Sequence, residues 1–515
     1  MALLGADGGD ALSNPRFYDH FVLFLTTALV AAGLYANLAG PQPGMYLSPD
    51  SLRDIGMAQG LLDGNWFGDP NSLGEFRWYN PGFPVALALI SYVSGLSLFK
   101  ALAIAGPLIN GAALVLFHRL VKRCDGENAA FWAFVLLAFA LGIGGKDFLF
   151  PSFSRTGMPS SAGFTALLAA ALWATKKESV AGGLRSGVAL GGVFLIHPAP
   201  FLALGGAMAH QTCVGSGSLR SKLAWFLIAA GAASVVATPF LAPLIATDRL
   251  VQINAVPATW APSDFRNGIS LHLLCFDTIT LVSAAWWLSR RSHAWSATRS
   301  IVLSCTVLFI VAMIFHGVRI FFGVWLLPIP VHHFQFLFAA TLPISLGSLI
   351  AVWVRRSNRL RRWAVPAMAA LCLALLPAHR AVRPVFLLVY PAPMEKDFDF
   401  SLYRQVLANS RPDDLFLTDS KQDAAIAMAA GRKMVNLNIA FLANPYLDYQ
   451  RRETARKALV DRVLSEGLCA TLSNAGIPFA LLGSDRSPPD APPAFIVGNK
   501  STLYRTSDCA RPPAP

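Results

Sequence analysis

The sequence predicts a polytopic α-helical membrane protein, with about 9–12 membrane helices and a small C-terminal α/β domain outside the membrane. Of the 515 residues, 54% are hydrophobic and only 14% are charged, whereas a soluble globular chain carries about 25% charged residues. The apolar residues form many separate blocks, which excludes a soluble domain with one anchor. From residue 380 onward the composition becomes polar, and strand-like segments alternate with helix-like ones.

The positive charge of the chain follows the expected membrane topology. The formal net charge is +13, which by itself would invite a nucleic-acid partner. The basic residues, however, gather in short clusters between apolar blocks, as they do in cytoplasmic loops. These clusters are residues 118–123, 176–185, 290–299 and 355–362. We therefore expect no nucleic-acid partner and place the clusters in the cytoplasm.

The first apolar segment sets the orientation. Residues 20–39 are apolar over about 19 residues, too long for the core of a signal peptide, so we expect a retained first span and a cytoplasmic N-terminus. The first loop, residues 40–79, then lies outside. Alternation predicts about nine full spans within a membrane domain of residues 1–379, followed by an extracytoplasmic domain of residues 380–515. The expected location is the inner (plasma) membrane.

Two apolar segments do not fit as full spans. Residues 81–98 follow the first loop directly, begin with Pro81-Gly82, and are predicted to lie flat at the membrane surface. Residues 186–209 are interrupted by His197-Pro198-Ala199-Pro200, and proline breaks a helix. A re-entrant hairpin keeps the parity, with His197 near its tip and arms of about 11 residues, roughly half the bilayer each.

The C-terminal domain is predicted to be a small α/β unit. We expect strands at 414–418 and 479–482, helices at 421–430 and 453–475, and a strand pair at 495–497 and 502–505. Cys469 and Cys509 are the cysteines of this domain. In an oxidising compartment they can form a disulfide, and two unrelated thiols are the alternative.

The first loop holds the main candidate acids. It carries Arg53 and Arg77 against a larger set of carboxylates, namely Asp50, Asp54, Asp63, Asp69 and Glu75. Asp50 comes first after the span, at the depth of a membrane-borne head group, and is the leading candidate for a functional acid. Asp54 lies one helical turn later on the same face. Solvated or helix-capping acids are the alternative, and this is the expected role of Asp63 and Asp69.

Further candidates come from later loops and from the His-Pro break. Asp147 directly follows a span and could converge with Asp50; an interfacial Lys-Asp pair is the alternative. His197 lies inside a predicted membrane segment, where an ionisable residue is a functional candidate by default, and a histidine bonded to a neighbouring carbonyl is the alternative. For His332 and His333 the alternative is an interfacial anchor. The candidates for binding a donor phosphate or the substrate are Asp54, Lys146, Arg155, His197, Arg266, Arg319, His332 and His333.

Aromatic residues also mark the first loop. Trp66, Trp78 and Tyr79 could stack on sugar rings, and an interfacial belt is the alternative. The sequence has no zinc-type cysteine spacing and no phosphate-binding glycine loop. No cofactor is therefore required, and a divalent metal stays open.

Three stretches together resemble GT-C fold glycosyltransferases, a family that includes protein mannosyltransferases and the aminoarabinose transferases of lipid A. Residues 48–65, from Ser48-Pro49-Asp50 to the Leu61-Leu62 pair, resemble the first external loop of that family. Residues 78–84 resemble the aromatic-proline segment that follows it, and residues 192–198 are similar to its glycine-rich broken helix. The resemblance implies a sugar donor on a polyprenyl phosphate, Asp50 as the base and Asp147 as a second acid.

The implied reaction is an inverting sugar transfer to a glycan, lipid or protein acceptor outside the cytoplasm. The phosphate leaves as a stable anion, so the reaction needs a base for the acceptor hydroxyl and cations for the phosphate. One carboxylate base with attack on the opposite face inverts the anomeric carbon. A lipid or glycolipid transporter or flippase would also use a broken helix and intramembrane charge. A non-catalytic membrane assembly protein is the third interpretation.

Overall fold

The chain divides into two compact units, each built from several stretches of sequence. The first contains Met1–Gly44, Ala103–Ala237 and Ala261–Pro391, and the second contains Met45–Leu102, Thr238–Trp260 and Ala392–Pro515. Most of the first loop therefore falls in the same unit as the C-terminal region. The computed structural model describes residues 15–38, 49–140, 158–173, 179–247, 271–289, 296–322, 329, 331–356, 358–376, 398–439, 442–486, 488–492, 494–498 and 500–510.

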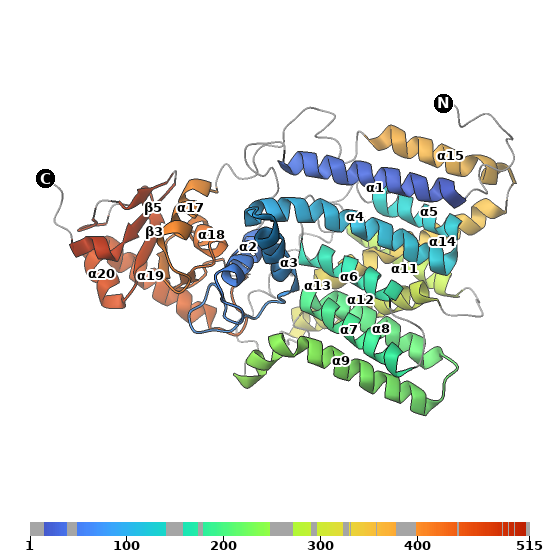
Figure 1. The fold of residues 1–515 in the computed structure, drawn as a ribbon, viewed down its shortest axis with the longest axis horizontal. Coiled ribbons are helices and arrows are strands. Elements are labelled where there is room, and N and C mark those ends of the chain that lie inside the picture. The colour runs from blue at the N-terminus through green and yellow to red at the C-terminus, as the bar shows by residue number, and fades with distance from the viewer. Residues whose placement is uncertain are drawn as a thin grey trace. The chain divides into compact units, whose positions relative to one another are not determined.

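Apolar helices make up the first unit (Figure 1). It contains α1 (Pro15–Leu38), most of α4 (Leu98–Asp125), α5 (Glu127–Val135) with the π-helix η2 (Leu136–Ala140), α6 (Pro159–Trp173), α7 (Val180–Ile196), α8 (Pro198–Val214), most of α9 (Leu219–Ala246), α11 (Leu271–Ser289), α12 (Ala297–Phe322), α13 (Val331–Ala339), α14 (Thr341–Arg355) and α15 (Asn358–Leu375).

Among the described residues, five helices are long and apolar enough to cross a membrane, by length and composition. They are Phe17–Leu38, Leu98–Asp125, Leu219–Ala246, Ala297–Val318 and Val331–Arg355. Shorter apolar helices accompany them. The protein is therefore a multi-pass membrane protein.

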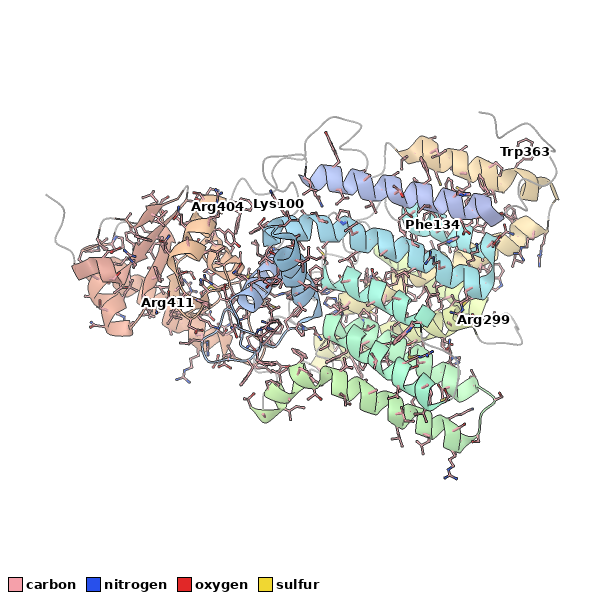
Figure 2. All side chains as sticks on the ribbon, in the orientation of Figure 1. Lys100, Phe134, Arg299, Trp363, Arg404 and Arg411 are labelled. Carbon is pink, nitrogen blue, oxygen red and sulfur yellow. A yellow bond between two sulfur atoms is a disulfide. The ribbon has the colours of Figure 1, made fainter. Side chains whose placement is uncertain are left out.

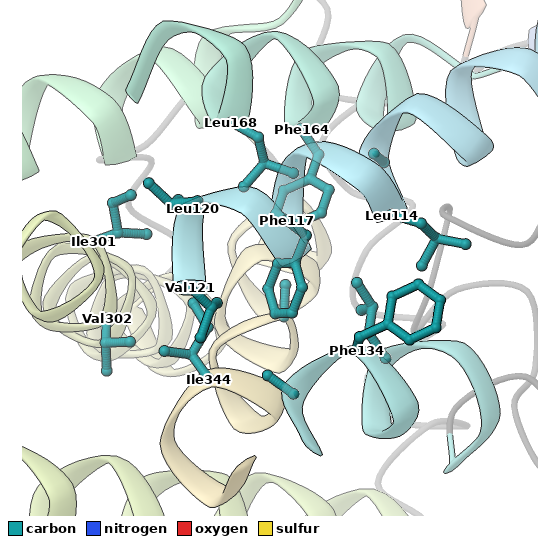
Figure 3. Close-up of a cluster of buried hydrophobic side chains, with 14 of the residues drawn as sticks. Leu114, Phe117, Leu120, Val121, Phe134, Phe164, Leu168, Ile301, Val302 and Ile344 are labelled. Carbon is teal, nitrogen blue, oxygen red and sulfur yellow. The ribbon is translucent and has the colours of Figure 1, made fainter. Parts of the chain in front are cut away.

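Large aromatic and aliphatic side chains fill the centre of this unit (Figure 3). Phe117 of α4, Phe134 of α5 and Phe164 of α6 are buried there. Small residues bring helix backbones close together: a Cβ on Gly347 of α14 would lie 2.5 Å from the backbone nitrogen of Ala133 in α5. Close helix packing of this kind is typical of membrane proteins, in which lipid supplies no strong drive for helices to associate.

The helix pair around His197 is longer than predicted. Helices α7 and α8 have 17 residues each, or about 25 Å at 1.5 Å per residue, so the prediction of arms of about 11 residues was wrong. The error lies at both ends, because α7 begins at Val180 and α8 runs to Val214. The Ser179 side chain accepts a hydrogen bond from the Gly182 amide and caps the helix, and Arg185 lies inside it. The predicted break at His197-Pro198 is where α7 ends and α8 begins.

The helix after the first loop is shorter than predicted. Helix α3 runs from Gly82 to Ser94, and the residue that caps its C-terminus, Gly95, has a φ of 67°. Glycine readily adopts this left-handed conformation. The 13 residues of α3 extend about 20 Å, less than the roughly 30 Å of a hydrocarbon core.

The second unit contains a five-stranded sheet in the order β2-β1-β3-β5-β4. The strands β1, β2 and β3 pair in parallel, whereas β5 runs antiparallel to β3 and β4. Besides α2 (Pro49–Leu62) and α3 (Gly82–Ser94), this unit contains α17 (Phe400–Asn409), β1 (Leu415–Thr418), α18 (Lys421–Ala429), β2 (Lys433–Met434), α19 (Tyr449–Glu466), α20 (Leu468–Ala475), β3 (Phe479–Gly483), β4 (Ile496–Val497), β5 (Ser501–Arg505) and the 3₁₀ helix η6 (Thr506–Ala510). A small C-terminal α/β region is thus present, as the sequence predicts.

One predicted helix in this region is two. The segment 453–475 was expected to be continuous, but Gly467 separates α19 from α20 with a φ of 114°. A Cβ at this position would lie 2.6 Å from the Asp490 carboxylate, so only glycine suits it. A disulfide joins Cys469 of α20 to Cys509 of η6, with their Cα atoms 5.5 Å apart.

Candidate functional site

Helix α2 (Pro49–Leu62) presents Asp50 in its first turn. Proline at the start and a carboxylate in the first turn both favour a helix N-terminus. Most of the remaining residues of α2 are buried, including the charged Arg53 and Asp54. The Asp50 side chain, by contrast, is 45% exposed. The helix thus presents one accessible carboxylate at the end of an otherwise buried segment.

Arg53 connects the acids of this helix. Its Nη1 donates to Asp50 Oδ1 at 2.9 Å, and its Nε and Nη2 donate to Asp54 Oδ1 at 3.2 and 3.0 Å. The guanidinium carbon lies 3.8 Å from the centroid of the Tyr79 ring, close enough for a cation–π contact. The structure therefore brings together three predicted site residues, Asp50, Asp54 and Tyr79, around Arg53, an arginine for which the sequence indicated no role beyond that of a counter-charge.

Burial shapes the protonation of this cluster. It raises the pKa of Asp54 to about 7, with the Arg53 charge opposing the shift and the Asp50 charge adding to it. Burial also raises the pKa of the Tyr79 phenol, again opposed by Arg53. Asp54 is only 1% exposed, so an acceptor molecule cannot reach its carboxylate as it can reach Asp50. Asp54 is therefore suited to hold Arg53, and Asp50 to take part in chemistry.

The other acids of the first loop contact the C-terminal region of the same unit. Asp63 forms an ion pair with Arg432 at 2.8 Å, and Glu75 one with Arg452 at 3.4 Å. The buried Asp69 accepts from the Asn444 side chain at 3.0 Å. The expectation of solvated or capping acids at Asp63 and Asp69 is corrected, because partners more than 300 positions later in the chain bind both.

The aromatic residues of the loop have different surroundings. The Trp78 and Tyr79 rings meet edge to face, with centroids 5.4 Å apart, so Trp78 adjoins the Arg53 cluster. Trp66 is 61% exposed. The structure therefore associates two of the three predicted aromatic residues with Asp50 through Tyr79 and Arg53.

Three predicted histidines come together in the first unit. The centroid of the His333 ring lies 4.6 Å from that of His197 and 4.1 Å from that of His332. His197 caps α8, because its Nδ1 accepts the Ala199 amide at 3.2 Å. A neutral His197 ring then carries its proton on Nε2. Helix α6 approaches closely here: a Cβ on Gly163 would lie 2.8 Å from the His197 Cβ.

A carboxylate that binds a residue of the histidine-bearing helix α13 was missed. Asp277 of α11 accepts a hydrogen bond from Gln335 Nε2 at 2.8 Å, and Gln335 follows His332 and His333 on α13. The Asp277 Oδ1 atom is buried without a hydrogen-bond partner in the described part of the chain. The signal in the sequence was a single acid within the apolar run of α11.

Several predicted site residues lie outside the described residues and stay predictions. These are Lys146, Asp147, Arg155 and Arg266, together with the side chain of Arg319 in α12. Within the described ranges, no three histidine, cysteine or acidic side chains are grouped so that they could hold a metal ion.

Comparison with solved structures identifies the fold. No family model and no curated protein matches the chain. Among solved structures it is similar to ArnT from Cupriavidus metallidurans bound to undecaprenyl phosphate, at 12% identity and a TM-score of 0.54, over 96% of this chain and 99% of that one. It is also similar to the mycobacterial arabinofuranosyltransferase AftD, at 13% identity and a TM-score of 0.52, over 94% of this chain and 41% of that one.

The Archaeoglobus fulgidus oligosaccharyltransferase also matches, at 13% identity and a TM-score of 0.48, over 89% of this chain and 68% of that one. At identities this low, the matches to ArnT and AftD concern the fold. The apolar helices, the first loop with α2 and the C-terminal α/β region together give this chain the GT-C fold of membrane glycosyltransferases.

Proposed function

We propose that the protein transfers a sugar from a polyprenyl-phosphate donor to an acceptor on the extracytoplasmic side of the membrane, with inversion and with Asp50 as general base. The observation that carries the proposal is the half-exposed Asp50 at the start of a buried helix. A similar fold in ArnT, which was crystallised with undecaprenyl phosphate, supports a donor of this class.

The proposed reaction requires a positioned base and a cationic pocket. The lipid phosphate is a good leaving group, so no acid is needed to protonate it. Asp50 would take the proton of the acceptor hydroxyl as the hydroxyl attacks the anomeric carbon from the face opposite the phosphate. Arg53 would hold the Asp50 carboxylate in position through the 2.9 Å ion pair.

Cations are needed where negative charge develops on the departing phosphate. In this proposal Lys146, Arg155, Arg266 and Arg319 supply them, with the cluster of His197, His332 and His333 as further donors. Asp147 assists or orients the acceptor. The exposed Trp66 and the Trp78–Tyr79 pair would contact sugar rings.

The test measures release of undecaprenyl phosphate, a product that does not depend on which acceptor is used. The purified full chain in nanodiscs is incubated with synthetic undecaprenyl-phosphate monosaccharides. Membranes of the organism that naturally makes the protein are added as the source of acceptor. We expect release with one of these donors. Asp50→Asn should lower it by at least about 10²-fold with membrane expression intact, because the amide cannot accept the proton.

The control is Asp461→Asn, which changes an exposed acid on α19 and should leave release unchanged. Near-normal release by Asp50→Asn would contradict the assignment of the base. Movement of intact donor across vesicle membranes without release would instead favour the transporter. A parallel reaction in EDTA decides whether a divalent metal takes part.

A further inference from the structure

The outer edge of the C-terminal sheet is occupied by the first loop. Strand β2 is the last strand on its side of the sheet, and an open edge strand leaves unpaired backbone groups. The Met434 amide of β2 donates to the Asn71 carbonyl at 2.9 Å. The neighbouring Lys433 is buried, and its Nζ donates to the Asp69 carbonyl at 2.5 Å. Loop residues therefore extend the contacts of the sheet beyond β2.

Helix α2 packs on helix α18 with almost no space between the backbones. A Cβ on Gly56 would lie 1.8 Å from the Met428 carbonyl oxygen. The turn after α18 is equally close: a Cβ on Gly431, which has a φ of 65°, would lie 2.9 Å from the Gly56 carbonyl oxygen. Figure 1 shows α2 beside α18. The middle of α2 is thus held against a rigid backbone surface.

Arg432 holds the far end of α2. Its Nη1 donates to Asp63 Oδ2 at 2.8 Å and to the Ala430 carbonyl at 2.9 Å. Its Nε donates to Ser410 Oγ at 2.8 Å and its Nη2 to the Ser410 carbonyl at 3.1 Å. The arginine is buried. It therefore joins Asp63, one residue beyond α2, to the end of α17 through a fully used guanidinium.

We propose that the C-terminal α/β region positions the candidate base, with Arg432 as the positioning residue that acts through Asp63 on α2. This inference rests on the proposed function of Asp50. Gly56 is the close contact in the middle of the helix, with Asp63 about 10 Å along the axis in one direction and Asp50 about 9 Å in the other. Moving Asp63 by about 1 Å would then swing Asp50 by a similar amount, and an error of that size can lower a rate about 10²-fold.

The experiment has one readout that needs no activity. Hydrogen exchange of the peptide covering residues 49–62 is measured by mass spectrometry on the full chain in nanodiscs. Asp63→Asn removes the charge pair but leaves Arg432 bonded to Ser410, so the fold is retained, and exchange in α2 should rise by about 10-fold. Arg432→Ala should raise it further, and Arg432→Lys should restore part of the protection.

The second readout separates positioning from binding. In the undecaprenyl-phosphate release assay, Asp63→Asn should lower kcat by about 10-fold or more and leave the KM for the donor within about 3-fold. The control is Arg404→Ala, an exposed arginine of α17 that is labelled in Figure 2; it should change neither readout.

The outcomes separate this inference from the proposed function. Unchanged exchange in α2 for both Asp63→Asn and Arg432→Ala overturns the positioning role, whatever the activity. Raised exchange with unchanged kcat also overturns it, because Asp50 would then not depend on the placement of α2. If the unaltered chain releases no undecaprenyl phosphate from any donor, the proposed function fails, while exchange still decides whether Arg432 holds the helix.

Discussion

The two units of this protein neutralise their buried and partly buried acids in mainly different ways. In the second unit three acids of the first loop form ion pairs, Asp54 with Arg53, Asp63 with Arg432 and Glu75 with Arg452, whereas Asp69 accepts from the Asn444 amide. In the first unit Asp277, the single acid of helix α11, is hydrogen-bonded by an amide, that of Gln335.

The difference follows from the cost of desolvation. An ionised pair removed from water is stable only when its geometry is good and its remaining hydrogen bonds are made. For the Asp63–Arg432 pair, Ser410 and Ala430 of the C-terminal region supply those bonds. A single charge within a membrane helix is costlier still, and neutral donors are the partners present beside Asp277. Asp50, which combines a cation with 45% exposure, is the acid whose charge remains accessible.

The largest effect in this comparison is expected from removing the cation at α2. At pH 8, above the pKa of Asp54, Arg53→Met leaves the Asp54 carboxylate buried without its partner and should lower the free energy of unfolding by about 3–5 kcal/mol. Adding Asp54→Leu should recover most of the loss, because an apolar pair of similar volume needs no neutralisation. Guanidinium titration of the full chain in detergent, followed by tryptophan emission, measures both. The matched control is Arg462→Met on the exposed side of α19.

A loss below about 1 kcal/mol in Arg53→Met would contradict the comparison. It would mean that Asp54 is neutral in the folded protein even at pH 8 and needs no cation.

A smaller effect is expected in the membrane unit. Gln335→Leu removes the amide that donates to Asp277 Oδ2 and should cost about 1–3 kcal/mol, the usual penalty for a buried acceptor left without a partner. The double variant with Asp277→Leu should be more stable than Gln335→Leu alone, since neither polar group then remains. The same guanidinium titration measures the stability of both variants. Equal stabilities of Gln335→Leu and of the double variant would show that Asp277 does not depend on Gln335.

Local patterns were sufficient to predict much of the fold. Strand β1 and strand β3 are short apolar runs between turn residues, and α18 begins with a capping box at Ser420 and Asp423, all of which can be read within a few residues. The break between α7 and α8 was predicted for the same reason, because Pro198 cannot continue α7.

Contacts between distant parts of the chain could not be predicted in this way. Asp63 and Arg432 are 369 positions apart, so the sequence near Asp63 contains nothing to distinguish a buried ion pair from a solvated acid. The role of Arg53 was hidden for a related reason. Its spacing from Asp50 is ordinary on a helix, and only the fold reveals that the arginine is buried over Tyr79.

The finest test of the comparison is the pH dependence that Asp54 contributes. Burial raises its pKa from the ordinary 3.8 to about 7, so between these values the folded protein binds a proton that the unfolded chain has released. Stability should therefore fall as pH rises from about 4 to about 7, by at most about 1.4 kcal/mol per pH unit, and be constant above that range. Asp54→Asn cannot titrate and should lack this slope. The difference between the two titration midpoints at pH 5, 6, 7 and 8 isolates the effect, and a difference that does not vary with pH would mean that Arg53 holds Asp54 ionised throughout.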